Sequence, residues 1–225
     1  MKLKSDLPPV MPNRRKFTDK LKSGQQFEPK INRELFEFVF GSTGLKINFA
    51  KESFQRLREL EKYLELLAKD IVNGKTEKTP NERKYFDFLC ELDFFIFELY
   101  GSLDFFSREI NFVLELGLKE QECNLFRINE VVENDTIKNV IGEMLNSEWF
   151  DYFHKLRIRI THRLAIVLSS RNNEFFFPDN PLSTFPKNNL KKIKVIPNCQ
   201  LWLEKSLTYV DEISGFLGMR IFSNW

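Results

Sequence analysis

Glycine and proline are scarce in this chain, with only nine of each in 225 residues. An all-β fold needs many turns, and these two residues are the ones that most turns require. Long apolar runs are absent as well, because charged residues interrupt every apolar stretch, and the N-terminus has no secretory leader pattern. The chain is therefore predicted to be cytoplasmic, without a membrane segment and without a β-sandwich or β-barrel.

Residues that bind metals or form disulfides are few. The three cysteines, Cys90, Cys123 and Cys199, are odd in number and far apart, and the two histidines, His154 and His162, are eight residues apart. This pattern favours neither a disulfide framework nor a zinc site. Walker loops and dinucleotide-binding fingerprints are also missing from the sequence. We therefore expect no metal and no cofactor.

A large excess of one charge is missing too, since the net charge is only +2. Its distribution is uneven: residues 1–30 carry eight Lys and Arg against three Asp and Glu, whereas residues 79–122 carry four against ten. Any basic surface must therefore be local. Residues 1–29 also hold several prolines and show no sustained period, which predicts an irregular basic arm, either solvated or in contact with nucleic acid. Residues 30–225 are predicted to form a single helical domain.

Phenylalanine, in contrast, is abundant, with 24 copies, and apolar residues recur at helical spacing through much of the chain. We expect an all-α protein. The segments predicted to be helical are 50–72, a long helix from Thr79-Pro80 to about residue 118, 135–145, about 147–169, and from 198 onward. Residues 31–40 could form a short helix or a strand ended by Gly41 to Gly44, residues 120–134 should be a loop, and residues 187–196 should be a strand or an extended basic segment.

The long predicted helix is apolar over more than one face, which places it at the centre of the fold or at an interface. Several acidic residues interrupt this apolar surface and could either meet basic groups of a neighbouring helix or remain solvated. These are Glu91, Asp93, Glu98, Asp104 and Glu109.

The segment 147–169 contains both histidines and has two distinct faces. Ser147 is a predicted N-cap, followed by Glu148 in the first turn. One face is an apolar stripe that should meet the core, made of Trp149, Phe153, Leu156, Ile160, Leu164 and Val167. The opposite arc mixes polar and apolar side chains and should be covered by something else; it comprises His154, Arg157, Ile158, Thr161, His162 and Ala165.

Imidazole and guanidinium groups can cleave RNA without a metal. The reaction needs a base for the 2′-hydroxyl, an acid for the leaving 5′-oxygen and a cation on the phosphate. On a regular helix Arg157 and His162 are about 140° apart, so they flank a site rather than converge on it. A two-fold axis beside the helix would bring two copies of each to one cleft and would cover Ile158. We therefore expect a homodimer through this helix.

The run Arg157-Ile158-Arg159-Ile160-Thr161-His162, an arginine followed after four residues by a histidine, resembles the motif of the HEPN superfamily. The resemblance implies an up-and-down bundle of four or more helices, dimerisation through the motif helices, and metal-independent RNA endonuclease activity. It also implies a place in toxin–antitoxin or phage-defence systems, with an antitoxin or another protein as partner. Arg157 and His162 would then be the catalytic residues.

The neighbouring polar residues receive lesser roles. His154, Arg159, Thr161 and Arg163 are predicted to contact RNA or to support the catalytic pair, with Arg159 and Arg163 either solvated or steering phosphate. Arg157 could alternatively pair with an acid of the long helix. Many HEPN proteins have a polar residue directly after the motif arginine, whereas this chain has Ile158. That departure favours the alternative of a catalytically inactive module that binds RNA, a nucleotide or a protein.

Overall fold

The computed structural model describes residues 33–72, 82–161, 166, 168–171, 174–178, 181 and 193–218. In chain order the elements are α2 (Arg33–Val72), α3 (Glu82–Val113), η1 (Glu120–Glu122), α4 (Leu125–Val131), α5 (Asp135–Leu145), α6 (Glu148–Thr161), β1 (Ser169–Arg171), β2 (Glu174–Phe177), β3 (Ile193–Lys194) and α7 (Val195–Phe216). The described part is mostly helical, which confirms the predicted fold class at that level. The predicted arm, residues 1–29, lies outside it.

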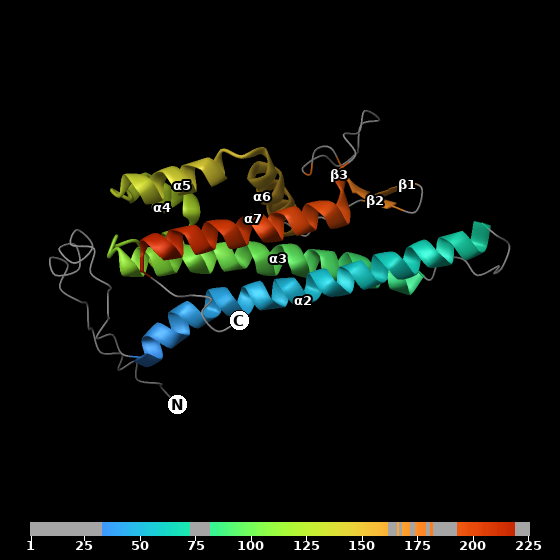
Figure 1. Cartoon of the computed structure of the whole chain (residues 1–225), viewed down its shortest axis with the longest axis horizontal. Coiled ribbons are helices and arrows are strands. Elements are labelled where there is room, and N and C mark those ends of the chain that lie inside the picture. The colour runs from blue at the N-terminus through green and yellow to red at the C-terminus, as the bar shows by residue number, and fades with distance from the viewer. Residues whose placement is uncertain are drawn as a thin grey trace.

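The long helices α2 and α3 form an antiparallel hairpin, and α7 lies beside them along most of its length (Figure 1). In the same view α4, α5 and α6 are drawn above α7, although α4 and α6 also contact α3, and the small sheet lies at the end where α7 begins. One continuous core joins these elements. Its largest fully buried side chains include Phe88, Phe95, Phe106, Phe150, Phe153, Phe177 and Trp202. The abundance of phenylalanine in the sequence is thus accounted for largely by this core.

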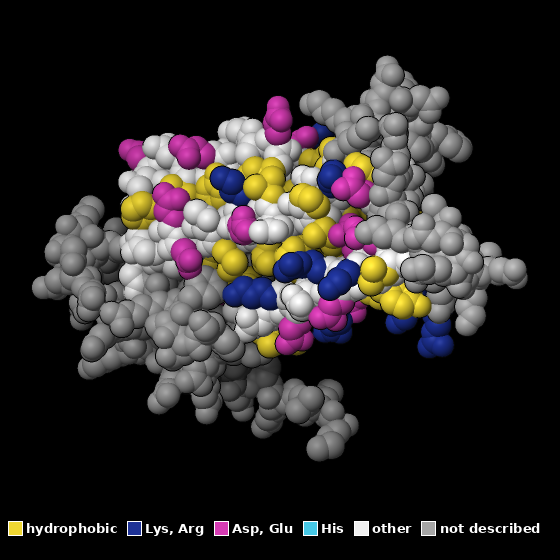
Figure 2. All heavy atoms as spheres, turned by 45° about the vertical axis from the view of Figure 1, so that its right-hand side comes forward, with side chains coloured by type: hydrophobic (Ala, Val, Ile, Leu, Met, Phe, Trp, Pro, Cys, Tyr) yellow, Lys and Arg dark blue, Asp and Glu magenta, His cyan; other side chains and the backbone are white. Residues whose placement is uncertain are grey.

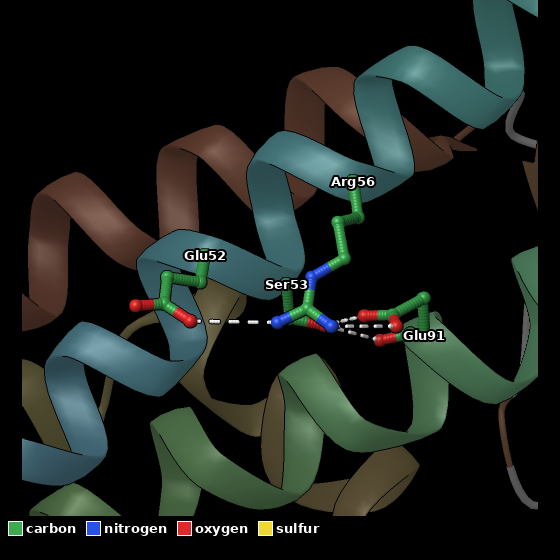
Figure 3. Close-up of polar contacts among 4 residues, drawn as sticks. All are labelled: Glu52, Ser53, Arg56 and Glu91. Atoms are coloured by element: carbon green, nitrogen blue, oxygen red, sulfur yellow. Dashed lines mark hydrogen bonds and ion pairs between the residues drawn. The ribbon is translucent and has the colours of Figure 1, made fainter.

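Polar contacts fix the register of the α2–α3 hairpin. Ser53 Oγ lies 2.6 Å from Glu91 Oε2, and the Arg56 guanidinium lies 3.4 Å from Glu91 and 3.4 Å from Glu52 (Figure 3). About two helical turns along the hairpin from this cluster, Lys46 Nζ lies 2.9 Å from Glu98 Oε2. Glu91 and Glu98 therefore meet basic side chains of a neighbouring helix, as the sequence predicted for acids of the long helix.

The glycines at Gly41 and Gly44 do not end a helix, which corrects the prediction of a break there: α2 runs through them without interruption. Gly44 is buried, and the adjacent Thr43 is fully buried with its hydroxyl donating to Glu109 of α3. A glycine in a helix interior costs about 1 kcal/mol relative to alanine. Packing along α3 outweighs that local cost.

The segment 120–134 is not a plain loop as predicted, because it contains the turn η1 and the helix α4. Asn124 caps α4 by accepting a hydrogen bond from the Arg127 amide at 3.0 Å, and Leu125 and Ile128 are buried. Seven residues are too few to show a helical period in the sequence. The next helix, α5, is confirmed at its predicted bounds, with the Asn134 side chain as its N-cap.

The sheet is antiparallel with strand order β1-β2-β3. Ser169 pairs with Phe176 across β1 and β2, and Phe176 pairs with Lys194 across β2 and β3. β3 gives residues Ile193 and Lys194 the extended conformation predicted before the last helix. That helix, α7, begins at Val195, three residues earlier than predicted.

Several large apolar side chains remain exposed on the described helices. They are Leu45, Phe49, Tyr63, Leu66, Phe86, Phe94, Phe97, Phe126, Leu201 and Phe216. Figure 2 shows one face of the molecule, where hydrophobic side chains lie among Lys, Arg, Asp and Glu. Among the described helices, none has a stretch both long and apolar enough to span a bilayer.

Candidate functional site

Helix α6 carries the predicted site and is shorter than the sequence suggested. The Ser147 hydroxyl lies 3.4 Å from the Phe150 amide, which fits its predicted capping role. The helix is described as far as Thr161, residues 166 and 168 are not helical, and Ser169–Arg171 form β1. The prediction of a helix to about residue 169 is therefore wrong. Pairing of β1 with β2 supplies hydrogen bonds that a longer helix would forgo.

The inner face of α6 is the predicted apolar stripe. Phe153 and Leu156 are fully buried, and Trp149 and Ile160 are partly buried against the core. The Phe153 ring lies 5.7 Å from that of Tyr100 on α3 and 5.2 Å from that of Trp202 on α7. Leu164 and Val167, the last two members of the stripe, lie outside the described side chains.

Part of the second arc of α6 is covered by the same chain, because His154 and Arg157 lean against α3. The Arg157 Cζ lies 4.9 Å from the Phe97 ring centroid and 5.7 Å from that of Tyr100. Ile158 is half-buried and Thr161 is exposed. The covering expected from a second subunit is thus supplied in part by α3.

Arg157 has an unusual environment for a partly buried arginine. Its guanidinium makes no hydrogen bond or ion pair to any residue in the described ranges, and its Nε is buried without a partner. The predicted alternative, an ion pair with an acid of the long helix, is therefore not present among those residues. The positive charge is held by two aromatic faces instead, each cation–π contact contributing about 0.5–2 kcal/mol.

Asp104 is an acid of α3 whose pKa is affected by the charge of Arg157. Burial raises the pKa of the Asp104 carboxyl to about 6, while the positive charges of Arg157, Arg108 and Lys46 lower it. Within the described part of the chain, Asp104 forms no hydrogen bond and no ion pair. Lys46 pairs with Glu98, and Arg108 pairs with Glu120 at 2.6 Å.

His154 is oriented by Tyr100, whose hydroxyl lies 2.7 Å from Nδ1. Burial lowers the pKa of His154 below its ordinary value, and the nearby Arg157 lowers it further, although Asp151 raises it. Burial also raises the pKa of Tyr100, so the phenol stays protonated. Because a neutral imidazole has one N–H, a phenol that donates to Nδ1 leaves the proton on Nε2.

The remaining predicted residues divide into three groups. Arg159 is 4% exposed and donates through Nη1 to the Pro181 carbonyl at 2.8 Å, so it is neither solvated nor free to steer phosphate, which corrects that prediction. The Thr161 hydroxyl is within hydrogen-bond distance of its own helix, 2.7 Å from the Arg157 carbonyl. His162 and Arg163 lie outside the described residues, so the structure gives no position for the predicted catalytic histidine.

Sequence reasoning named Asp104 among the acids of the long helix that could meet basic groups, but it missed the aromatic contribution of α3 to this region. Phe97, Tyr100 and Asp104 are spaced three and four residues apart, which puts them on one face of α3 beside Arg157. For the two aromatic residues the signal in the sequence was that α3 is apolar over more than one face. In the described ranges, no group of three or more His, Cys, Asp or Glu side chains is placed to hold a metal ion.

Comparisons with protein-family models, with curated proteins and with solved structures each gave no match. The function of this chain is therefore inferred from its own residues and their geometry.

Proposed function

We propose that this chain is a HEPN-type RNA-binding protein of the cytoplasm that holds an RNA phosphate with Arg157 and cleaves the strand with His162. The supporting observation is the Arg157 guanidinium, which is partly buried, stacked on Phe97 and Tyr100, and unpaired within the described chain. A partly desolvated cation without an acidic partner is costly, and a phosphate would relieve that cost. The two rings fix the guanidinium in advance, so little side-chain entropy is lost on binding.

The proposed chemistry is attack of the RNA 2′-hydroxyl oxygen on its own 3′-phosphate. One His162 imidazole accepts the 2′-hydroxyl proton, and the imidazolium of a second subunit donates a proton to the departing 5′-oxygen. The products are a 2′,3′-cyclic phosphate and a 5′-hydroxyl end. Arg157 stabilises the added negative charge on the phosphorane. We also propose that the protein is a homodimer and that an antitoxin or another protein regulates its activity.

Arg157→Ala is expected to weaken binding of fluorescein-labelled single-stranded RNA by about tenfold to a hundredfold, because a hydrogen bond between charged groups contributes about 1.5–3 kcal/mol. Fluorescence anisotropy at fixed ionic strength measures this. Arg127→Ala is the matched control, since Arg127 is an exposed arginine of α4 that pairs with Glu130. Equal losses in the two variants would indicate a nonspecific charge effect and contradict the assignment.

Cleavage is tested separately from binding. The wild-type protein is expected to degrade single-stranded RNA in the presence of EDTA, and His162→Ala should abolish this while leaving RNA binding largely intact. Denaturing gels and end analysis for 2′,3′-cyclic phosphate check the result. Cleavage at the same rate by His162→Ala would show that this imidazole has no part in the reaction.

A second candidate function is an inactive binding module that dimerises through α6. The observation in its favour is that Ile158 is apolar, lies on the outer arc and is only half-buried within one chain. Ile158→Glu is then expected to shift the protein from dimer to monomer in sedimentation velocity. If wild type also binds RNA without cutting it, this second candidate replaces the first.

A further inference from the structure

One face of α3, together with the side of α6 and Phe126 of α4, forms a surface that combines exposed aromatic rings with polar side chains. Phe97 and Phe126 are 43% and 41% exposed. Phe97 lies next to Arg157, and the Phe126 ring centroid is 5.2 Å from that of His154. Between them Tyr100 contacts both His154 and Arg157. We call these residues, with Asp104, the α3–α6 surface.

Three polar groups of the α3–α6 surface lack a protein partner among the described residues. They are the Arg157 guanidinium, the Asp104 carboxylate and the Nε2 atom of His154, which hydrogen-bonds through Nδ1 alone. Asp104 lies one turn of α3 beyond Tyr100, on the face that contacts Arg157, and among the described residues it forms no ion pair with Arg157. The aromatic contacts hold the Arg157 guanidinium in place, so it does not form an ion pair with the Asp104 carboxylate.

A ligand that satisfies both charges must carry an anion for Arg157 and hydrogen-bond donors for Asp104. A nucleotide carries both, with the phosphate for Arg157 and a base edge for Asp104. An ionised carboxylate accepts hydrogen bonds only, so it selects bases by their donors. Guanine presents two adjacent donors, N1–H and the N2 amino group, whereas uracil, cytosine and adenine each place a lone-pair acceptor beside their donor. Guanine is thus the base that a carboxylate pairs with in bidentate fashion.

We propose that the α3–α6 surface is a guanosine-binding subsite for single-stranded RNA, in which Asp104 accepts the guanine N1–H and N2–H and Arg157 holds the adjoining phosphate. The base packs against the exposed aromatic edges of the surface, which requires it to be unstacked and hence single-stranded. This inference rests on the proposed RNA binding and adds a base preference to it.

The test compares labelled oligouridines that carry one central G, A or C. The wild-type protein is expected to bind the G-containing strand about tenfold more tightly than the others, as a bidentate base contact typically gives. Asp104→Asn should abolish that preference while keeping affinity for plain oligouridine, because an amide replaces one acceptor oxygen by an NH2 donor and so cannot pair with two adjacent N–H donors in bidentate fashion. Asp151→Asn, an exposed carboxylate on α6 with the same charge change, is the matched control and should keep the preference.

The outcomes separate this inference from the proposed function. Equal binding of all four strands by wild type overturns the guanosine subsite, and the wild-type series decides this even if Asp104→Asn does not fold. A guanine preference that survives in Asp104→Asn also overturns it. In both cases a large loss of affinity in Arg157→Ala keeps the proposed RNA binding. If Arg157→Ala binds as well as wild type, the proposed function fails and the subsite with it.

Discussion

Replacing Glu109 with glutamine is expected to stabilise the protein at about pH 9 by several kcal/mol and to leave its stability near pH 5 almost unchanged. Glu109 is fully buried between α3 and α2. Its Oε1 accepts a hydrogen bond from the Thr43 hydroxyl at 2.6 Å, and its Oε2 is buried without a partner. A carboxylate in that position lacks the hydrogen bonds that its charge requires.

The pH window follows from the pKa of Glu109. Burial raises this pKa to about 8, although the hydrogen bonds from Thr43 lower it. In the unfolded chain a glutamate titrates near pH 4.5, so between these values the folded state holds a proton that the unfolded state has lost. The stabilising contribution of the neutral carboxyl is complete below about pH 4.5, and it falls as the pH rises to about 8. Glutamine is uncharged at every pH, so the variant does not lose this stabilising contribution as the pH rises.

Urea unfolding followed by circular dichroism at a series of pH values measures this difference. Glu122→Gln, a change at an exposed residue of η1, is the control and should follow the wild-type curve. Other carboxyl groups with a raised pKa, such as Glu61 at about 7, also make the free energy of unfolding depend on pH, but they are present in both proteins. Parallel curves for wild type and Glu109→Gln would show that Glu109 is ionised in the folded state and refute the prediction.

Phe153→Ala is expected to lower the free energy of unfolding by about 3–5 kcal/mol, the usual cost of truncating a buried phenylalanine. Phe153 is fully buried on the inner face of α6, where its ring contacts Tyr100 of α3 and Trp202 of α7. The cavity would therefore open where three helices meet. Because a small domain has about 5–15 kcal/mol of total stability, the loss would bring the protein close to unfolding at ordinary temperatures.

Chemical denaturation measures the loss, with Phe94→Ala as the matched control. Phe94 is also a phenylalanine in a helix but is 42% exposed, so its truncation should cost about 1 kcal/mol or less. If Phe153→Ala does not fold, Phe153→Leu, which leaves a smaller cavity, gives the intermediate value. Similar losses at positions 94 and 153 would mean that α6 does not pack as described.

Local signals in the sequence were sufficient for several elements. The sequence predicted α5 at its observed bounds, and the spacing on α6 predicted that Phe153 and Leu156 face the core. These features depend on neighbours within one or two helical turns, which a sequence pattern records directly.

Features that depend on distant parts of the chain were not predictable in the same way. The sequence predicted a break at Gly41 to Gly44, but packing against α3 keeps α2 continuous there. It predicted a helix to about residue 169, whereas β1 pairs with β2 from Ser169 onward. In each case a local propensity of about 1 kcal/mol was outweighed by tertiary contacts, and these contacts cannot be inferred from the local sequence pattern.

The sequence by itself determined that this protein is mostly helical, that α6 has an apolar inner face, and that Arg157 lies on its other side. Only the tertiary structure decided what surrounds Arg157. Its aromatic partners, Phe97 and Tyr100, and the nearby Asp104 lie more than fifty residues earlier in the chain. Periodicity fixes which face of a helix a residue occupies, but the packing of α6 on α3 sets which side chains meet across that face.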